Sequence, residues 1–98
     1  MVIEWLEFKV ERSIQAHFLE CDRQIWTAAL ATCPGYHSKE VWQNPQDPDT
    51  VIVMVRWTSR DQWQSIDPQW LAELEAQFQG AVGAGYSLEV VKEFTVLA

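Results

Sequence analysis

Three side chains stand out in this sequence by their type and position as candidates for acid–base chemistry: His37, Arg56 and Glu4. His37 opens a predicted strand, and imidazole is the side chain that titrates closest to neutrality. Glu4 shares a strand face with apolar residues, where a carboxylate either pairs with a cation or has a raised pKa. Arg56 is the one charged residue of its apolar strand, so we expect it to pair with Glu4. For His37 the alternative is an edge histidine that is hydrogen-bonded to the backbone or to solvent. For Glu4 the alternatives to a functional acid are a structural ion pair with Arg56 and exposure to solvent at the end of the strand.

Aromatic side chains are candidates for holding an apolar ligand. The chain has six Trp among 98 residues, and each indole combines a large apolar area with one N–H donor. The residues predicted to line a ligand pocket are Trp42, Asn44, Trp57, Trp63, Trp70 and Tyr86. Packing in the core or in a subunit interface is the alternative, which we expect for Trp5, Trp26 and Trp57.

No motif of specific spacing adds a further chemistry. The glycines at 80–85 neither follow a strand nor open a helix, as a phosphate-binding loop would require. The acidic loop around Asp47 and Asp49 lacks the spacing and the Glu of a calcium-binding loop. Cys21 and Cys33 are not spaced as metal ligands, so we expect reduced thiols. The sequence therefore predicts no metal and no cofactor.

The acidic charge of the chain limits its partners. Its net charge is -7, and its seven basic residues are dispersed, whereas nucleic-acid binding uses clustered Lys and Arg. No signal peptide is visible, and no apolar run approaches the ~20 residues of a membrane helix. We therefore expect a cytoplasmic protein that binds neither nucleic acid nor membranes.

Chain length and apolar content bear on assembly. A chain of 98 residues is one domain, spanning 1–98, and folding hides roughly 65% of the surface of such a chain. Hydrophobic residues make up 48% of the chain and aromatic residues 12%, which is rich for so small a core. Excess apolar surface often lies in a subunit interface, so we expect a homodimer.

Alternating and helical apolar patterns predict the elements that position these side chains. Strands are predicted at 2–10, 36–44, 51–57 and 87–97, with residues 51–57 as a central strand because both faces are apolar. Helices are predicted at 13–31 with Ser13 as N-cap, at 59–66 after a capping box, and at 69–79 after Asp67-Pro68. The last strand is expected to carry Leu88, Val90, Phe94 and Val96 on one face. A turn is predicted at 44–49. The order β-α-β-β-α-β is typical of a ferredoxin-like α+β fold with a four-stranded antiparallel sheet.

Two short segments carry a family resemblance: Pro34-Gly35-Tyr36 before the second strand, and Val55 to Ser59 before a helix. With Asp47, Asp49, Arg60 and Trp63, they resemble the antibiotic-biosynthesis-monooxygenase (ABM) domain over nearly the whole chain. More narrowly, the chain is similar to a group of small cyanobacterial proteins of that superfamily. The resemblance implies a dimeric α+β barrel, with a cavity in each subunit between sheet and helices.

The resemblance also bounds the function. Haem-degrading members use an Asn on the first strand and a His on the helix matching 69–79, and this sequence has neither. Quinone-forming members need no metal or flavin. The resemblance thus implies a protein that holds a small apolar or aromatic ligand and, if it is an enzyme, a cofactor-independent monooxygenase. A non-catalytic binding or dimerisation module with a side-chain-filled barrel is the alternative, and a haem-binding protein is a more distant one.

Overall fold

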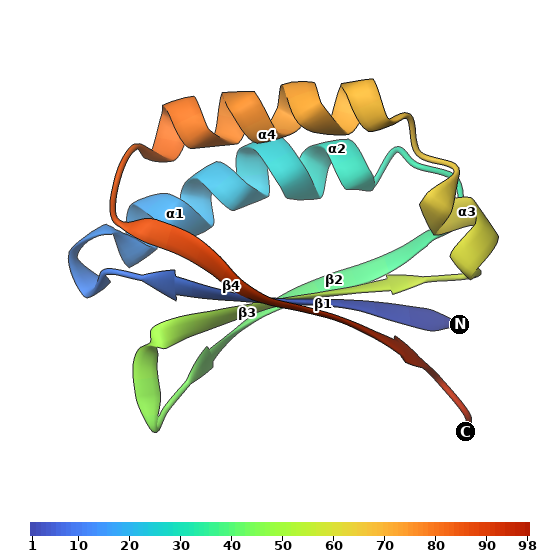
Figure 1. Ribbon diagram of the computed structural model, residues 1–98, viewed down its shortest axis with the longest axis horizontal. Helices are drawn as coiled ribbons and strands as arrows, with labels where there is room; N and C mark the ends of the chain where they lie inside the picture. The colour runs from blue at the N-terminus through green and yellow to red at the C-terminus, as the bar shows by residue number, and fades with distance from the viewer.

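A four-stranded antiparallel sheet forms one layer of the protein, and helices cover one of its two faces, as the computed structural model of residues 1–98 shows (Figure 1). The strands are β1 (Val2–Val10), β2 (Tyr36–Asn44), β3 (Asp47–Trp57) and β4 (Tyr86–Thr95), in the order β2-β3-β1-β4. The helical segments are η1 (Arg12–Ile14), α1 (Gln15–Asp22), η2 (Arg23–Thr27), α2 (Ala28–Leu30), α3 (Arg60–Gln64) and α4 (Pro68–Val82). The predicted ferredoxin-like α+β fold and the central place of β3 are confirmed.

The first helical region runs without a break from Arg12 to Leu30 but is not regular. It begins with a 3-10 turn and contains a π-helical turn, η2, between α1 and α2. The predicted N-cap at Ser13 is wrong, because the first turn begins at Arg12 and Glu11 is at the N-cap position. The backbone N–H of Glu11 donates to Gly85 O at 2.9 Å, which fixes the start of the first turn there.

The hairpin between β2 and β3 is tighter than the predicted turn at 44–49. Only Pro45 and Gln46 lie outside the strands, and β3 already begins at Asp47. The Asp47 carboxylate accepts hydrogen bonds from Lys9 Nζ and from Thr50 Oγ1, the latter at 2.7 Å. These contacts hold the acidic segment in the sheet, so it is strand rather than loop.

The helix starts after β3 follow the predicted caps. Ser59 Oγ accepts from the backbone N–H of Gln62 at 3.2 Å, and Asp67 accepts from Gln69 N–H at 3.0 Å with Pro68 in the first turn. α4 continues beyond the predicted end at residue 79, because Val82 still packs in the core. Gly83, with φ 80°, ends the helix.

Strand β4 contains a bulge that the sequence pattern did not predict. Glu7 pairs with Val90 and Phe8 with Leu88, so Glu89 has no partner on β1. The extra residue reverses the alternation of side chains beyond it. The prediction that Leu88, Val90, Phe94 and Val96 share one face is therefore wrong for Leu88. Leu88 faces the helices, whereas Phe94 lies on the opposite face against Trp5.

The core lies between the helices and the inner face of the sheet, which we define as the face toward the helices. One cluster gathers Phe18, Phe78 and Val82 against Val10 and Val51, and a second surrounds Trp57, which is fully buried. None of the helices combines the length and apolar character needed to cross a bilayer.

Candidate functional site

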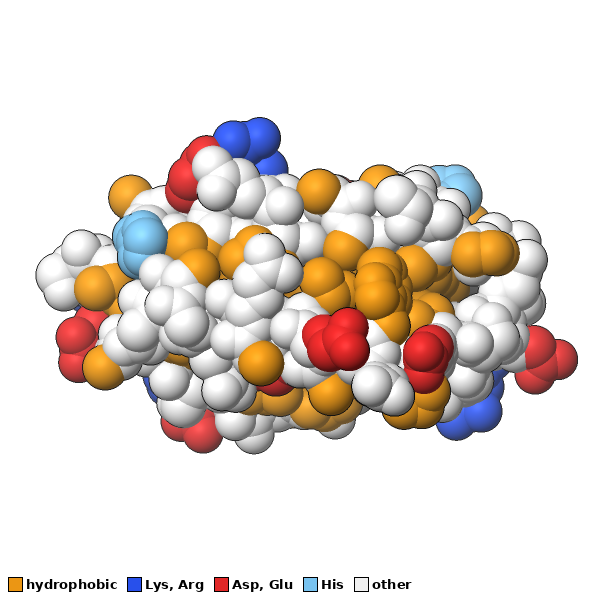
Figure 2. Space-filling view, turned by 90° about the horizontal axis from the view of Figure 1, so that it is seen from above, with side chains coloured by type: hydrophobic (Ala, Val, Ile, Leu, Met, Phe, Trp, Pro, Cys, Tyr) orange, Lys and Arg blue, Asp and Glu red, His pale blue; other side chains and the backbone are white.

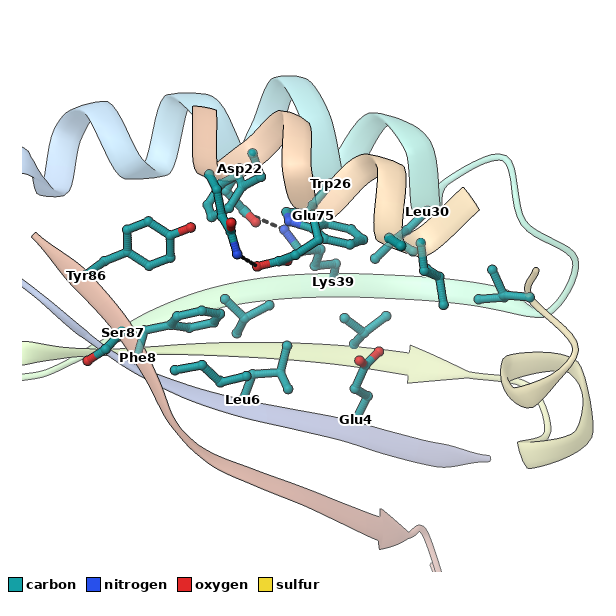
Figure 3. A pocket seen from close by; sticks show the side chains of 18 of the residues that line it. Glu4, Leu6, Phe8, Asp22, Trp26, Leu30, Lys39, Glu75, Tyr86 and Ser87 are labelled. Carbon is teal, nitrogen blue, oxygen red and sulfur yellow. Dashed lines mark hydrogen bonds and ion pairs between the residues drawn. The ribbon is translucent and has the colours of Figure 1, made fainter. Parts of the chain in front are cut away.

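A cavity of about 760 Å³ separates the inner face of the sheet from the helices. Its floor comes from β1 and β3, with Leu6, Val53 and Val55, and its roof includes Trp26 from η2 and Phe78 from α4. Figure 3 shows Leu6 on the sheet and Trp26 on the helices at opposite sides of this space. The cavity is mainly apolar and lies within the size range of small-molecule sites.

The cavity opens between α4 and β4. Its solvent-exposed lining residues all come from this part of the chain: Ala72, Glu75, Gln79, Gly83, Ser87 and Leu88. The lining residues from β1, β3 and the first helical region are buried or half-buried. Figure 2, which looks onto the helical layer, shows hydrophobic side chains reaching the surface along the middle of this face, with carboxylates beside them.

Glu4 supplies a carboxylate to the cavity floor. Trp57 Nε1 donates to Glu4 Oε1 at 3.1 Å. Burial raises the pKa of the Glu4 carboxyl above its ordinary value, while the Trp57 hydrogen bond and the positive charge of Lys39 oppose this rise. Glu4 is therefore a stronger base than an exposed carboxylate.

Lys39 supplies a buried ammonium group on the other side of the floor. Its Nζ forms an ion pair with Asp22 and donates to Thr27 Oγ1 at 2.7 Å. The side chains of Lys39 and Asp22 are 2% and 7% exposed, so this pair is screened little by solvent. The pair connects the first helical region to edge strand β2, and the dashed line between Asp22 and Lys39 in Figure 3 marks it.

Glu4 and Lys39 lie in one row across the sheet. Val55 on β3 pairs with Glu4 on β1 and with Lys39 on β2. Neighbouring strands are about 4.8 Å apart, so the backbones at Glu4 and Lys39 are separated by roughly 10 Å. The two polar groups thus flank an apolar strip of floor.

The predicted ion pair between Glu4 and Arg56 is wrong. Arg56 pairs with Ile3 in the register of β1 and β3, so its side chain lies on the outer face, which points away from the helices. There Arg56 Nη1 donates to Glu40 at 2.6 Å and to Ser38 Oγ at 3.2 Å. A one-residue difference in register decides the face of a strand residue, and the sequence alone does not give that register.

Three of the predicted pocket residues line the cavity: Trp57, Trp63 and Tyr86. Tyr86 lies at the edge of the cavity, where burial raises the pKa of its phenol and the negative charge of Glu75 raises it further.

The other predicted site residues lie elsewhere. Trp42 is on the outer face, where its ring contacts Trp5 at a centroid distance of 5.5 Å. Asn44 closes the hairpin by accepting from Gln46 N–H at 3.0 Å, and Trp70 does not line the cavity. His37 is exposed, with its Nδ1 3.0 Å from Ser38 Oγ, and Arg56 lies on the outer face.

Sequence reasoning missed Lys39 and Asp22. A signal was present for Asp22, which follows Phe18 by four residues and so falls on the buried stripe of its helix. A carboxylate on such a stripe requires a cation. Lys39 is two residues before Val41, which also identifies it with the inner face of β2.

Comparison with known proteins gives one family match. The family model described as antibiotic biosynthesis monooxygenase matches residues 1–66. No curated protein sequence matches the chain.

Solved structures share the fold over almost the full chain. A provisionally named antibiotic biosynthesis monooxygenase from Bordetella bronchiseptica has a TM-score of 0.77 at 16% identity, covering 99% of this chain and 97% of that one. SnoaB, a cofactor-independent oxygenase from Streptomyces nogalater, has a TM-score of 0.74 at 19% identity, covering 99% and 93%. The ActVA-Orf6 monooxygenase of Streptomyces coelicolor, solved with nanaomycin D, has a TM-score of 0.74 at 16% identity, covering 99% and 88%. At these identities the likeness shows the fold.

Proposed function

Because the chain belongs to the antibiotic biosynthesis monooxygenase (ABM) family, we propose that it binds a small aromatic ligand between sheet and helices and oxidises it without a cofactor. The observation that carries this proposal is the mainly apolar cavity of about 760 Å³ with the Glu4 carboxylate in its floor. Apolar walls with a few polar groups are typical of sites for small organic ligands. SnoaB, of the same fold, is a cofactor-independent oxygenase.

The reaction proposed is oxidation of an anthrone-type methylene group to a carbonyl. A base removes a proton from the methylene carbon, and the resulting carbanion passes one electron to dioxygen. The two radicals combine to a peroxide anion, which takes the proton back from the base. The resulting hydroperoxide eliminates water and leaves the quinone carbonyl. One oxygen atom enters the product and the other leaves as water, so the protein supplies only a base, donors for the oxyanion and an apolar site.

Glu4 is the proposed base. Its raised pKa increases its affinity for a proton, and Trp57 Nε1 orients the carboxylate by a hydrogen bond of 3.1 Å. Tyr86, at the cavity edge, retains a hydroxyl proton and is the proposed donor to an oxygen of the ligand. His37 and Arg56 have no role in this proposal, because both lie outside the cavity.

The filled-barrel alternative is supported less well, because side chains leave this volume between the layers open.

The proposal extends to assembly as a homodimer. The outer face of the sheet is bare of helices in Figure 1 and carries large apolar side chains, among them Trp5, Trp42 and Phe94. A second copy of this chain is the proposed partner, since two-fold symmetry lets the same face cover itself.

Oxygen uptake with an anthrone, corrected for its uncatalysed oxidation, tests the proposed reaction. We expect uptake with the wild type and a roughly 100- to 10,000-fold lower kcat for Glu4→Gln, the usual contribution of a general base. The matched control is Glu7→Gln, since Glu7 lies on the same strand but on the outer face, where it accepts from Trp5 Nε1 at 2.9 Å. Equal rates for Glu4→Gln and the wild type would remove Glu4 from the mechanism, and no uptake above background would refute the oxygenase.

A further inference from the structure

We propose that Lys39 is a ligand-binding residue whose ammonium group donates a hydrogen bond to a neutral carbonyl oxygen of the ligand. This inference rests on the proposed aromatic ligand and adds a second polar anchor to it. The ligand is then an aromatic compound that carries oxygen at two places, a hydroxyl or acidic C–H at Glu4 and a carbonyl at Lys39.

The hydrogen bonding of Lys39 leaves one donor free. An ammonium group has three N–H donors, and the protein supplies two acceptors, the carboxylate of Asp22 and the hydroxyl of Thr27. The Lys39 side chain is 2% exposed yet lines the cavity. A buried donor without an acceptor costs stability, so the remaining N–H calls for an acceptor inside the cavity.

The charge around Lys39 indicates which acceptor fits. Asp22 already neutralises the ammonium group, and Glu4 and Glu75 add carboxylates to the cavity lining. A ligand carboxylate or phosphate would meet this negative charge without a free cation to balance it. A carbonyl oxygen accepts a hydrogen bond without bringing a charge, so a ketone or quinone is favoured over a fatty acid.

The π-helical turn is a second, independent observation at this site. Asp22 and Thr27 are five residues apart, and in a regular α-helix such residues point about 140° away from each other. The i→i+5 turn Arg23–Thr27 brings them to the same side, where both bind Lys39. Trp26, in the same turn, lines the cavity. Such turns are rare and occur frequently at functional sites.

The spacing of the two anchors favours a polycyclic ligand. Glu4 and Lys39 flank Val55 in one row of the sheet, with their backbones roughly 10 Å apart. Both side chains line the same cavity (Figure 3). A fused ring system that lies over Val55 would present oxygen atoms toward both ends of this row, whereas a single ring would reach only one.

Two ligands that differ only in their carbonyl groups test this inference: 2-hydroxyanthraquinone and 2-hydroxyanthracene. Their affinities are measured by calorimetry without oxygen, for the wild type and for Lys39→Met/Asp22→Leu, which replaces both charges by apolar groups and leaves neither unpaired. We expect the double variant to bind the quinone roughly 10- to 100-fold more weakly, the effect of one hydrogen bond to a charged donor, and to bind the anthracene unchanged.

A second ion pair supplies the matched control. Lys9 and Asp47 pair on the exposed rim of the sheet, away from the cavity, so Lys9→Met/Asp47→Leu is expected to leave both affinities unchanged. If Lys39→Met/Asp22→Leu does not fold, Lys39→Met/Asp22→Asn takes its place, because the amide keeps the shape of the carboxylate.

The results separate the two proposals. Suppose that both ligands bind the wild type, but the double variant binds the quinone as tightly as the wild type does, or loses affinity for both ligands equally. Lys39 is then a structural residue only, and the inference fails while the aromatic site stands. If neither ligand binds the wild type, the proposed aromatic site fails, and this inference fails with it.

Discussion

Glu4 shows how its surroundings change the chemistry of a common side chain. Its carboxylate is surrounded by apolar residues of the cavity floor, and its one hydrogen bond comes from Trp57. Desolvation disfavours the ionised form and outweighs the hydrogen bond, so the pKa of Glu4 is raised. The raised pKa makes Glu4 a stronger base, but burying the ionised carboxylate lowers the stability of the folded protein. This loss of stability can be measured without any ligand.

The stability of Glu4→Gln relative to the wild type should depend on pH. Below the ordinary carboxyl value of 4.5, Glu4 is protonated in both the folded and the unfolded chain, so its ionisation adds nothing. As pH rises above that value, the unfolded chain ionises first, and the wild type loses stability until folded Glu4 has also ionised. The variant lacks this loss, because its amide does not titrate.

Urea unfolding of both proteins across this pH range measures the effect. We expect the difference in unfolding free energy between Glu4→Gln and the wild type to move in favour of the variant with rising pH and then to level off. A difference independent of pH, or one that moves the other way, would show that the pKa of Glu4 is not raised. The Glu7→Gln variant is the control, since its carboxylate lies on the outer face.

The type of each cavity residue could be predicted more easily than its partner. Glu4 was identified from its apolar neighbours, and Trp57, Trp63 and Tyr86 from their chemistry, and all four line the cavity. The prediction that Arg56 is the partner of Glu4 was wrong, because the pairing of β1 with β3 puts Val55, not Arg56, opposite Glu4. Registers between distant strands depend on packing of the whole sheet.

Two irregularities, a π-helical turn in the first helical region and a bulge in β4, change the directions of side chains in a way that the apolar pattern of the sequence does not predict. The π-helical turn Arg23–Thr27 aligns two polar side chains on Lys39, and its dihedral angles at the flanking residues are those of an ordinary helix. No residue type in this segment marks it in advance. The bulge at Glu89 likewise changes which residues of β4 face outward.

The bulge determines the composition of the outer sheet face. It places Phe94 beside Trp5 at a centroid distance of 5.8 Å, and Trp42 lies on the other side of Trp5. Trp42 and Phe94 are 38% and 46% exposed, although each is large and apolar. An apolar face of this kind is typical of a subunit interface.

Replacing Trp5 tests the proposed dimer. We expect the wild type to have about twice the chain mass of 11.4 kDa by light scattering at micromolar concentration. Trp5→Glu should give the monomer mass, because it would bury an unpaired carboxylate between the two sheets. Trp70→Glu, on α4 and away from this face, should remain dimeric. A monomeric wild type would contradict the proposed assembly.

The layers of the whole molecule leave a cavity that neither of them fills. Members of both buried clusters, among them Val55 and Phe78, line the cavity, which extends to a mouth at α4 and β4. The layer arrangement could be predicted from the order of elements. The volume of the cavity could not be predicted, because it depends on the distance between α4 and the sheet. No sequence pattern indicates that distance.

Ligand-induced thermal stabilisation, with the cavity mouth open or blocked, tests the proposed site most directly. Ala72 and Ala76 are both exposed on α4, but only Ala72 lines the cavity. An anthrone that binds the folded state should raise the melting temperature of the wild type and of Ala76→Trp in proportion to RT ln(1 + [L]/Kd). Ala72→Trp should abolish the rise by filling the mouth. No rise with the wild type, or an equal rise with Ala72→Trp, would contradict a ligand site between sheet and helices.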